Sequence, residues 1–317
     1  MTRFSAKCLI AAVVMAFAAI PSNAETLRVG KAASRAFSFV PVDVGVATGI
    51  FKKHGLDIKI SSFGGEAKVQ QAMAAGSIDI GISSGPGMVF VAKGAPVKAV
   101  AAMADQPLIF VLVVRNDGSV KSVDDLKGRT VGVSGVGSVT NWLITEISRQ
   151  HGWGVEGIKR AGLGNDANRV AALKTKSIDA AIVNITVALK YVHSGEGKII
   201  LKFNNVKDFH IHAIYASNKI IAEHPEAVRE FLAGWFETIK FMRNNKAKTD
   251  EIAGKVMNTD AKTTSEIYDE VMPMFDDDGH FKPKALANLG RSFVELKQLP
   301  KAPDMQKLID ERFLPKQ

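Results

Sequence analysis

Short apolar runs alternate with amphipathic stretches in the first part of the chain, which predicts strands alternating with helices. Residues 27–32 and the alternating run at 56–60 predict two strands. Between them Pro41 stands where its missing N–H costs a helix start nothing. Residues 67–75 predict a second helix and residues 78–82 a third strand. This order favours a parallel sheet with right-handed crossovers, and therefore an α/β fold.

A second series of elements follows two further predicted strands. Residues 97–103 form the first of these strands. Residues 108–114 are apolar at every position, which is typical of a strand buried on both faces. Ser122 then lies three residues before Asp125, the spacing of a capping box, and residues 130–133 are a short β-branched strand.

A glycine turn after that strand is the first candidate binding element. Gly135 and Gly137 predict a sharp turn, and Ser138 is placed to cap the next helix. A helix start after such a turn gathers free backbone N–H groups and the positive end of a helix dipole, which suits a small anion. A turn that only connects two elements is the alternative. No Gly-Lys-Ser/Thr follows, so it is not a Walker loop, and it matches a dinucleotide fingerprint only weakly.

An internal repeat indicates two similar α/β units. The triplet Ser-Ile-Asp at 77–79 recurs at 177–179 (177 − 77 = 100), and the preceding helical and following apolar positions recur at the same offset. Each copy ends in a polar loop, at 83–85 and at 184–186. Ligands of open α/β sheets bind at the carboxyl ends of strands, where these loops lie. Asp79 and Asp179 precede equivalent strands, so we interpret them as a repeated structural pair rather than a catalytic one.

The remainder of the chain is mostly helical. Residues 198–203 and 210–216 predict two more strands, the second returning the chain to the first unit. From Pro225 the apolar residues recur at helical spacing. Further helices are expected around 252–257, 267–275, 286–296 and 305–313, packed on the first unit.

Composition and charge exclude several classes. The chain has 317 residues, 46% hydrophobic, which is incompatible with a disordered chain. The formal charge is +9, spread along the chain without a basic run, so we expect no nucleic-acid partner. The single cysteine, Cys8, falls in the predicted leader described next, so neither a thiolate nucleophile nor a Cys-ligated metal is expected.

The first 24 residues have the pattern of a secretory signal peptide. Arg3 and Lys7 precede an apolar run at 8–20, which is shorter than the roughly 20 residues that a membrane span needs. Small residues at 22–24 predict cleavage after Ala24 and a periplasmic product.

Several motifs along residues 26–200 resemble a known family. They are VP at 40–41, ATGIFKKHGLD at 47–57, AAGSIDIG at 74–81, GAP at 94–96 and DLKGRTVGV at 125–133. Together they resemble the periplasmic substrate-binding proteins of ABC importers in the NMT1/THI5-like group, which covers nitrate, sulfonate, taurine and thiamine-pyrimidine binders. The motifs identify the family and not the ligand.

The resemblance implies a two-lobe type II periplasmic binding protein fold. Two hinge strands would cross between the lobes near 113–117 and 213–217, and the C-terminal helices would pack on lobe one. Lobe one would hold residues 25–115 and 216–317, and lobe two residues 116–215. The lobes would close on a ligand about the hinge.

The resemblance also implies which loops contact the ligand. Hydroxyls, amides, backbone N–H groups and one arginine suit a small organic anion of the sulfonate or carboxylate type. The expected contacts are Ser34, Arg35, Phe37, Ser83, Ser84, Ser138, Thr140, Asn141, Trp142, Asn165, Asn184 and Thr186. Loop scaffolding without ligand contact is the alternative for each of them.

The expected function is a solute-binding component that delivers its ligand to an ABC permease and its ATPase. We expect a monomer with no cofactor, no metal and no enzymatic activity. His210 and His212 share a face of a predicted strand, but no third ligand is readable beside them. The alternatives are a binder of a thiamine-type pyrimidine and an exported enzyme acting on a small pyrimidine or aromatic acid. The similar yeast-type pyrimidine synthase depends on a cysteine-rich motif that is absent here. A sensory module would need a membrane span or DNA-binding segment in this chain, and we find neither.

Overall fold

A computed structural model describes residues 24–135 and 138–316. The predicted leader up to residue 23, with Cys8, and Gly137 of the predicted turn lie outside these ranges. No helix in the described ranges combines the length and the apolar character that a membrane span requires.

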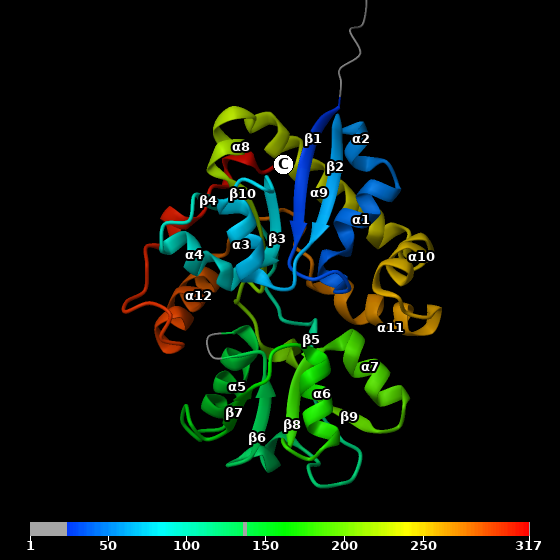
Figure 1. The fold of residues 1–317 in the computed structure, drawn as a ribbon, viewed down its shortest axis with the longest axis vertical. Coiled ribbons are helices and arrows are strands. Elements are labelled where there is room, and N and C mark those ends of the chain that lie inside the picture. The colour runs from blue at the N-terminus through cyan, green and yellow to red at the C-terminus, as the bar shows by residue number, and fades with distance from the viewer. Residues whose placement is uncertain (1–23, 136–137, 317) are drawn as a thin grey trace, which may run out of the picture.

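Two five-stranded sheets form the core of the described chain (Figure 1). The first has the order β2-β1-β3-β10-β4 and the second the order β7-β6-β8-β5-β9. The first sheet contains β1 (Glu25–Lys31), β2 (Leu56–Ser62), β3 (Ile80–Ser84), β4 (Val97–Ala104) and β10 (His212–Ser217). The second contains β5 (Phe110–Arg115), β6 (Thr130–Val133), β7 (Lys159–Gly162), β8 (Ala180–Asn184) and β9 (Gly197–Lys202).

The two sheets share one topology, which agrees with the sequence repeat. In each sheet a central strand pairs in parallel with two neighbours, as β1 does with β2 and β3 and β6 does with β7 and β8. The parallel pairing expected from the order of the first elements is therefore present, while β10 and β5 run antiparallel to their neighbours. Each of these two strands enters its sheet directly from the other half of the molecule. It therefore starts at the end of the sheet where the parallel strands finish.

The chain passes between the sheets at residues 105–109 and 206–211. These two segments lie side by side, because Phe209 N–H donates to the Asp105 carbonyl (3.2 Å) and Ile211 N–H to the Ala104 carbonyl (2.9 Å). The expected crossings at 113–117 and 213–217 were placed too late in the sequence. Residues 110–115 and 212–217 are already strands of the sheet that the chain has entered. A uniformly apolar run does not indicate which sheet it joins. That the two sheets are the cores of two separately moving lobes stays a prediction.

Helices cover both sheets, and the C-terminal ones surround the first (Figure 1). The helices that follow strands of the first sheet are α1 (Val40–Ala47), α2 (Ile50–Lys53), α3 (Glu66–Ala74) and α4 (Met88–Ala92). Those of the second sheet are α5 (Val139–Gln150), α6 (Asp166–Lys174) and α7 (Ile185–His193). The C-terminal ones are α8 (Asn218–Glu223), α9 (Pro225–Asn244), α10 (Lys246–Met257), α11 (Ala261–Val271) and α12 (Pro283–Glu295).

The apolar stripe predicted after Pro225 is buried in α9. Phe231 and Trp235 of this stripe are fully buried, and the Phe231 ring stacks on Phe51 of α2 with centroids 5.2 Å apart. The helix predicted at 305–313 is instead two 3-10 turns, Met305–Leu308 and Glu311–Phe313. Asp310 N–H donates to the Ala99 carbonyl of β4 (2.8 Å), and this pairing with the sheet interrupts the helix.

Local predictions at the starts of a 3-10 turn and of two strands are confirmed. Ser122 and Asp125 form the capping box. Asp79 accepts a hydrogen bond from Arg28 N–H (2.9 Å), and Asp179 accepts one from Thr130 N–H (2.9 Å). The two aspartates therefore have the repeated structural role that the sequence indicated, each tying a strand to its parallel neighbour.

Candidate functional site

A cleft of about 1110 Å³ lies between the two sheets. Its lining comes from the segments that follow β1, β2, β3, β6, β7 and β8 and from the helices that begin there, together with Phe110 of β5, His212 of β10, Met257 and Gln298. The carboxyl ends of parallel strands thus face each other across one space, which is where ligands of open α/β sheets bind. We call the residues contributed by the two sides the first-sheet wall and the second-sheet wall.

Three helix N-termini converge on the second-sheet wall. Their capping residues are Ser138, Asn165 and Asn184, and all three line the cleft. Ser138 Oγ accepts from Asn141 N–H (3.2 Å), as the sequence predicted, and Asn184 Oδ1 accepts from Thr186 N–H (3.0 Å). Each helix directs its positive dipole end at the cleft, so this wall favours a negatively charged group.

Two threonines on this wall differ in how their hydroxyls are satisfied. Thr140 Oγ1 accepts from Ser134 N–H (2.9 Å) and lies 2.9 Å from Ser138 Oγ. Thr186 is 5% exposed, and its Oγ1 has no hydrogen-bond partner among the described residues. A buried hydroxyl without a partner is costly, so the hydrogen-bonding capacity of Thr186 is unused at the wall of the cleft.

A buried arginine on the same wall was missed by the sequence reasoning. Arg169 is 3% exposed and donates hydrogen bonds to the Gly164 carbonyl and to Asp166 Oδ1. Burial lowers the pKa of Arg169, which the carboxylate of Asp166 partly opposes. The three-residue spacing of Asp166 and Arg169 in one helix was the available signal for this pair.

The first-sheet wall carries an acid and a neutral imidazole. Glu66 is the first residue of α3, and its Oε2 accepts a hydrogen bond from Ser84 Oγ. Burial raises the pKa of Glu66 to about 7, against the lowering effect of the Ser84 hydroxyl. Burial lowers the pKa of His212 to about 3, so this ring is uncharged at neutral pH, and its Nδ1 has no partner among the described residues.

Aromatic rings occupy much of the remaining lining. Phe39, Phe63 and Phe90 belong to the first-sheet wall and Phe110 to the second. The edge of the Phe39 ring meets the His212 ring with centroids 5.1 Å apart. A ligand in this cleft would therefore meet apolar surface between the polar groups of the two walls.

The structure places most of the predicted contact residues at the cleft. Those that line it are Ser34, Arg35, Ser84, Ser138, Thr140, Asn165, Asn184 and Thr186. The other four, Phe37, Ser83, Asn141 and Trp142, are buried and do not belong to the lining. Their expected direct contact with a ligand is not supported by this geometry.

The two aromatic residues among those four serve packing. Phe37 is fully buried, with its ring edge-on to Tyr268 at a centroid distance of 6.1 Å, and Phe39 lines the cleft in its place. Trp142 stacks on Phe209 in the second crossing segment, with ring centroids 4.0 Å apart. An aromatic residue in a short turn or in the first turn of a helix gives no sequence signal for whether it will face the cleft or the core.

The charged residues of the lining are three cations and two acids. The cations are Arg35, Arg169 and Lys190, and the acids are Glu66 and Asp166. Lys190 of α7 also reaches across to the first-sheet side, where its Nζ donates to the Asn258 carbonyl (3.4 Å). The excess of positive charge agrees with the helix dipoles of the second-sheet wall.

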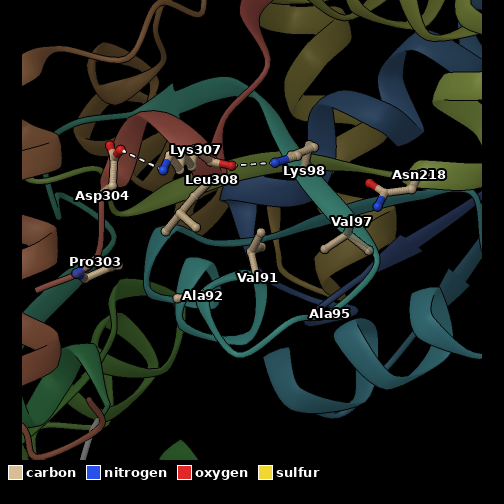
Figure 2. A pocket seen from close by; sticks show the side chains of 10 residues that line it. All are labelled: Val91, Ala92, Ala95, Val97, Lys98, Asn218, Pro303, Asp304, Lys307 and Leu308. Atoms are coloured by element: carbon tan, nitrogen blue, oxygen red, sulfur yellow. Dashed lines mark hydrogen bonds and ion pairs between the residues drawn. The ribbon is translucent and has the colours of Figure 1, made fainter. Parts of the chain in front are cut away.

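A smaller hollow of about 330 Å³ lies elsewhere, between α4, β4 and the turn at Met305–Leu308 (Figure 2). Its charged groups are engaged with one another. Lys98 Nζ donates to the Lys307 carbonyl, and Lys307 Nζ lies 3.8 Å from Asp304 Oδ2. This hollow offers no equivalent of the polar groups that meet in the cleft.

Within residues 24–135 and 138–316, no group of three or more His, Cys, Asp or Glu side chains is arranged to hold a metal ion. His210 Nε2 accepts a hydrogen bond from Lys282 N–H (2.9 Å), so the lone pair of that nitrogen is already used.

Comparison with known proteins identifies both family and fold. The model of the family described as NMT1/THI5 like matches residues 36–248. The protein named "Putative binding protein BAB2_1146" of Brucella abortus (strain 2308) is 28% identical over 221 residues. That match covers 67% of this chain and 66% of the relative. The chain therefore matches just under two thirds of the length of the Brucella protein.

Two solved structures show the same fold at low sequence identity. The periplasmic aliphatic sulphonate binding protein SsuA from Escherichia coli has a TM-score of 0.79 and 20% identity, covering 90% of this chain and 92% of that one. The periplasmic nitrate-binding protein NrtA from Synechocystis PCC 6803 has a TM-score of 0.69 and 16% identity, covering 91% and 86%. The chain therefore has the two-sheet α/β fold of periplasmic binding proteins.

Proposed function

Because this chain belongs to the NMT1/THI5-like family, we propose that it is the solute-binding component of an ABC uptake system and captures a small organic anion of the sulfonate or carboxylate type. The observation that supports this most directly is the second-sheet wall of the cleft. Three capped helix N-termini and the unpartnered hydroxyl of Thr186 meet there. Such a wall binds an oxyanion through fixed donors and requires no chemistry of the ligand.

Capture would proceed by closure of two lobes about the crossing segments. The proposed lobes keep the predicted ranges, 25–115 with 216–317 and 116–215, except that β5 and β10 belong to the sheets that they join. The closed complex would deliver its ligand to a membrane permease driven by an ATPase. The protein would act as a monomer in the periplasm, after cleavage of the leader behind Ala24. N-terminal sequencing of the exported protein tests this last point, since retention of residue 1 would contradict it.

A melting-temperature screen on refolded protein tests the ligand class. Unfolding and refolding first remove any ligand carried over from expression. The panel contains alkanesulfonates, taurine, aromatic carboxylates, nitrate and a thiamine pyrimidine. A ligand present at 100 times its dissociation constant adds about 2.7 kcal/mol to the free energy of unfolding, which raises the melting temperature by several degrees. A shift with sulfonates or carboxylates is expected, and a shift with the pyrimidine alone would refute the organic-anion proposal.

Two further measurements accompany the screen. Arg35→Ala removes an exposed cation of the lining and should weaken binding of the anion that gives the largest shift. Unchanged affinity would remove Arg35 from the site. The bound compound should be recovered unaltered after long incubation, because we propose a binding protein. Conversion of the compound would favour the alternative of an exported enzyme.

A further inference from the structure

The sequence repeat places one acid at the same position on each wall of the cleft. Glu66 and Asp166 are related by the repeat offset (166 − 66 = 100), and each is the first residue of its helix. Each is also contacted by the residue that ends the neighbouring strand. Ser84 Oγ donates to Glu66, and Asn184 N–H lies within 3.4 Å of Asp166 Oδ1. The two halves of the molecule thus present the same acid in the same setting.

The two acids differ in their counter-charge. Asp166 is paired with the buried guanidinium of Arg169. The position equivalent to Arg169 in the first unit is Val69 (169 − 100 = 69), which is fully buried and cannot supply a charge. Among the ion pairs of the described residues, none includes Glu66. The described interactions therefore leave Glu66 with the hydroxyl of Ser84 and no cation.

The other groups beside Glu66 do not replace the missing cation. An added Cβ at Gly87 would lie 2.8 Å from Glu66 Oε1, 2.9 Å from Tyr215 Oη and 3.1 Å from Gln70 Nε2, so these groups converge at this glycine. Tyr215 donates its hydroxyl to the Ser84 carbonyl (2.7 Å), and burial raises its pKa. His212, which pairs with Ser84 across β10 and β3, is uncharged at neutral pH. The titratable neighbours of Glu66 are therefore neutral.

We propose that Glu66 binds a positively charged amino group of the ligand, so that the preferred ligand is zwitterionic and spans the cleft. Its acidic group would face the helix N-termini and Thr186 of the second-sheet wall, and its amine would face Glu66 and Ser84. The hydrocarbon or aromatic part between the two ends would lie against Phe39, Phe90 and Phe110. This inference rests on the proposed function and adds to it a second recognition point on the opposite wall.

Matched ligand pairs test the amino group directly. Taurine is compared with propane-1-sulfonate, and 4-(aminomethyl)benzoate with 4-ethylbenzoate, by isothermal titration calorimetry at pH 8. In each pair a methyl group replaces the ammonium with little change of shape. A hydrogen bond to a charged partner predicts that the wild-type protein prefers the amino compound roughly 10- to 100-fold in at least one pair.

Two variants test whether Glu66 causes the preference for the amino compounds. Glu66→Gln should abolish it, because the amide keeps the size of the side chain and loses the charge. Glu156→Gln is the control, since Glu156 is 82% exposed on the second-sheet side and does not line the cleft. It should leave the preference unchanged. Near-ultraviolet circular dichroism of Glu66→Gln verifies that the variant is folded. If Glu66→Gln is not folded, Ser84→Ala is used in its place. It should reduce the preference for the amino compounds, because it removes the hydroxyl that orients Glu66.

The outcomes separate this inference from the proposed function. Equal binding of both members of each pair would overturn the role of Glu66 and leave the organic-anion proposal standing. A preference that persists in folded Glu66→Gln would likewise overturn it. Binding of none of the four compounds would refute the inference and count against the organic-anion proposal as well.

Discussion

Replacing Thr186 with valine should change stability and binding in opposite directions. The substitution keeps the shape of the side chain and removes a buried hydroxyl that has no partner among the described residues. An unsatisfied buried polar group costs about 1–3 kcal/mol, so the ligand-free variant should be stabilised by about 1 kcal/mol. For a chain of this size that corresponds to roughly 2 °C in melting temperature. The same hydroxyl would donate to a bound anion, so affinity should fall about fivefold.

Thr140→Val is the matched control on the same wall. Thr140 is 1% exposed, but its Oγ1 accepts from Ser134 N–H (2.9 Å). Valine there would leave a backbone N–H without a partner and should destabilise the protein by about 1–3 kcal/mol. Urea unfolding of both variants without ligand, and calorimetric titration with an anion that binds the wild type, measure the two effects. If Thr186→Val is destabilised as much as Thr140→Val, the Thr186 hydroxyl is already satisfied in the free protein and the reasoning is refuted.

Three further substitutions test the crossing segments and the acid of the first-sheet wall. In Gly85→Ala the added Cβ would lie 1.8 Å from the His210 carbonyl oxygen, so urea unfolding should show a loss of about 1–3 kcal/mol, or more. Gly135→Ala, where a Cβ meets no atom within 4 Å, is the control, and equal losses would contradict the argument. Trp142→Phe should leave ligand affinity within about twofold, because Trp142 packs on the crossing segment and lies outside the cleft lining. A larger loss of affinity would indicate that Trp142 contacts the ligand. The raised pKa of Glu66, about 7 in the folded protein, means that the folded state holds its proton more tightly than the unfolded chain. The free energy of unfolding should therefore decrease as the pH rises from about 4.5 to about 7, by about 2–3 kcal/mol from this group. Glu66→Gln should make the free energy of unfolding less dependent on pH in this range. An identical profile in the variant would show that Glu66 does not titrate in this range.

Features governed by neighbours in the chain were predictable from the sequence. The strand Thr130–Val133, the helix cap at Ser138 and the capping box at Ser122 were all predicted correctly. The physical reason is that β-branched runs and cap hydrogen bonds involve residues one to three positions apart. The internal repeat could also be predicted, because the same residues recur in the sequence at each copy and each copy forms the same strand and helix units.

Site residues were predictable mainly where they lie in loops at strand ends or, like Thr140 and Thr186, in the first helical turn after such a loop. Ser34, Arg35 and Asn184 followed from that rule and line the cleft. Glu66 and Arg169 did not, because no local pattern distinguishes a charged helix residue that faces a cleft from one that faces solvent. Trp142 and Phe37 were expected to contact the ligand, but both are buried outside the cleft lining.

By itself the sequence determined the α/β class, the two related units, the family resemblance and the polar loops at the strand ends. The tertiary structure decided which sheet β5 and β10 join, since strand pairing depends on contacts far apart in the chain. It also decided which polar side chains meet across the cleft, and that among the described residues Asp166 pairs with a buried arginine while Glu66 pairs with none. Counter-charge and burial are properties of packed neighbours from separate elements, and the order of residues along the chain does not specify them.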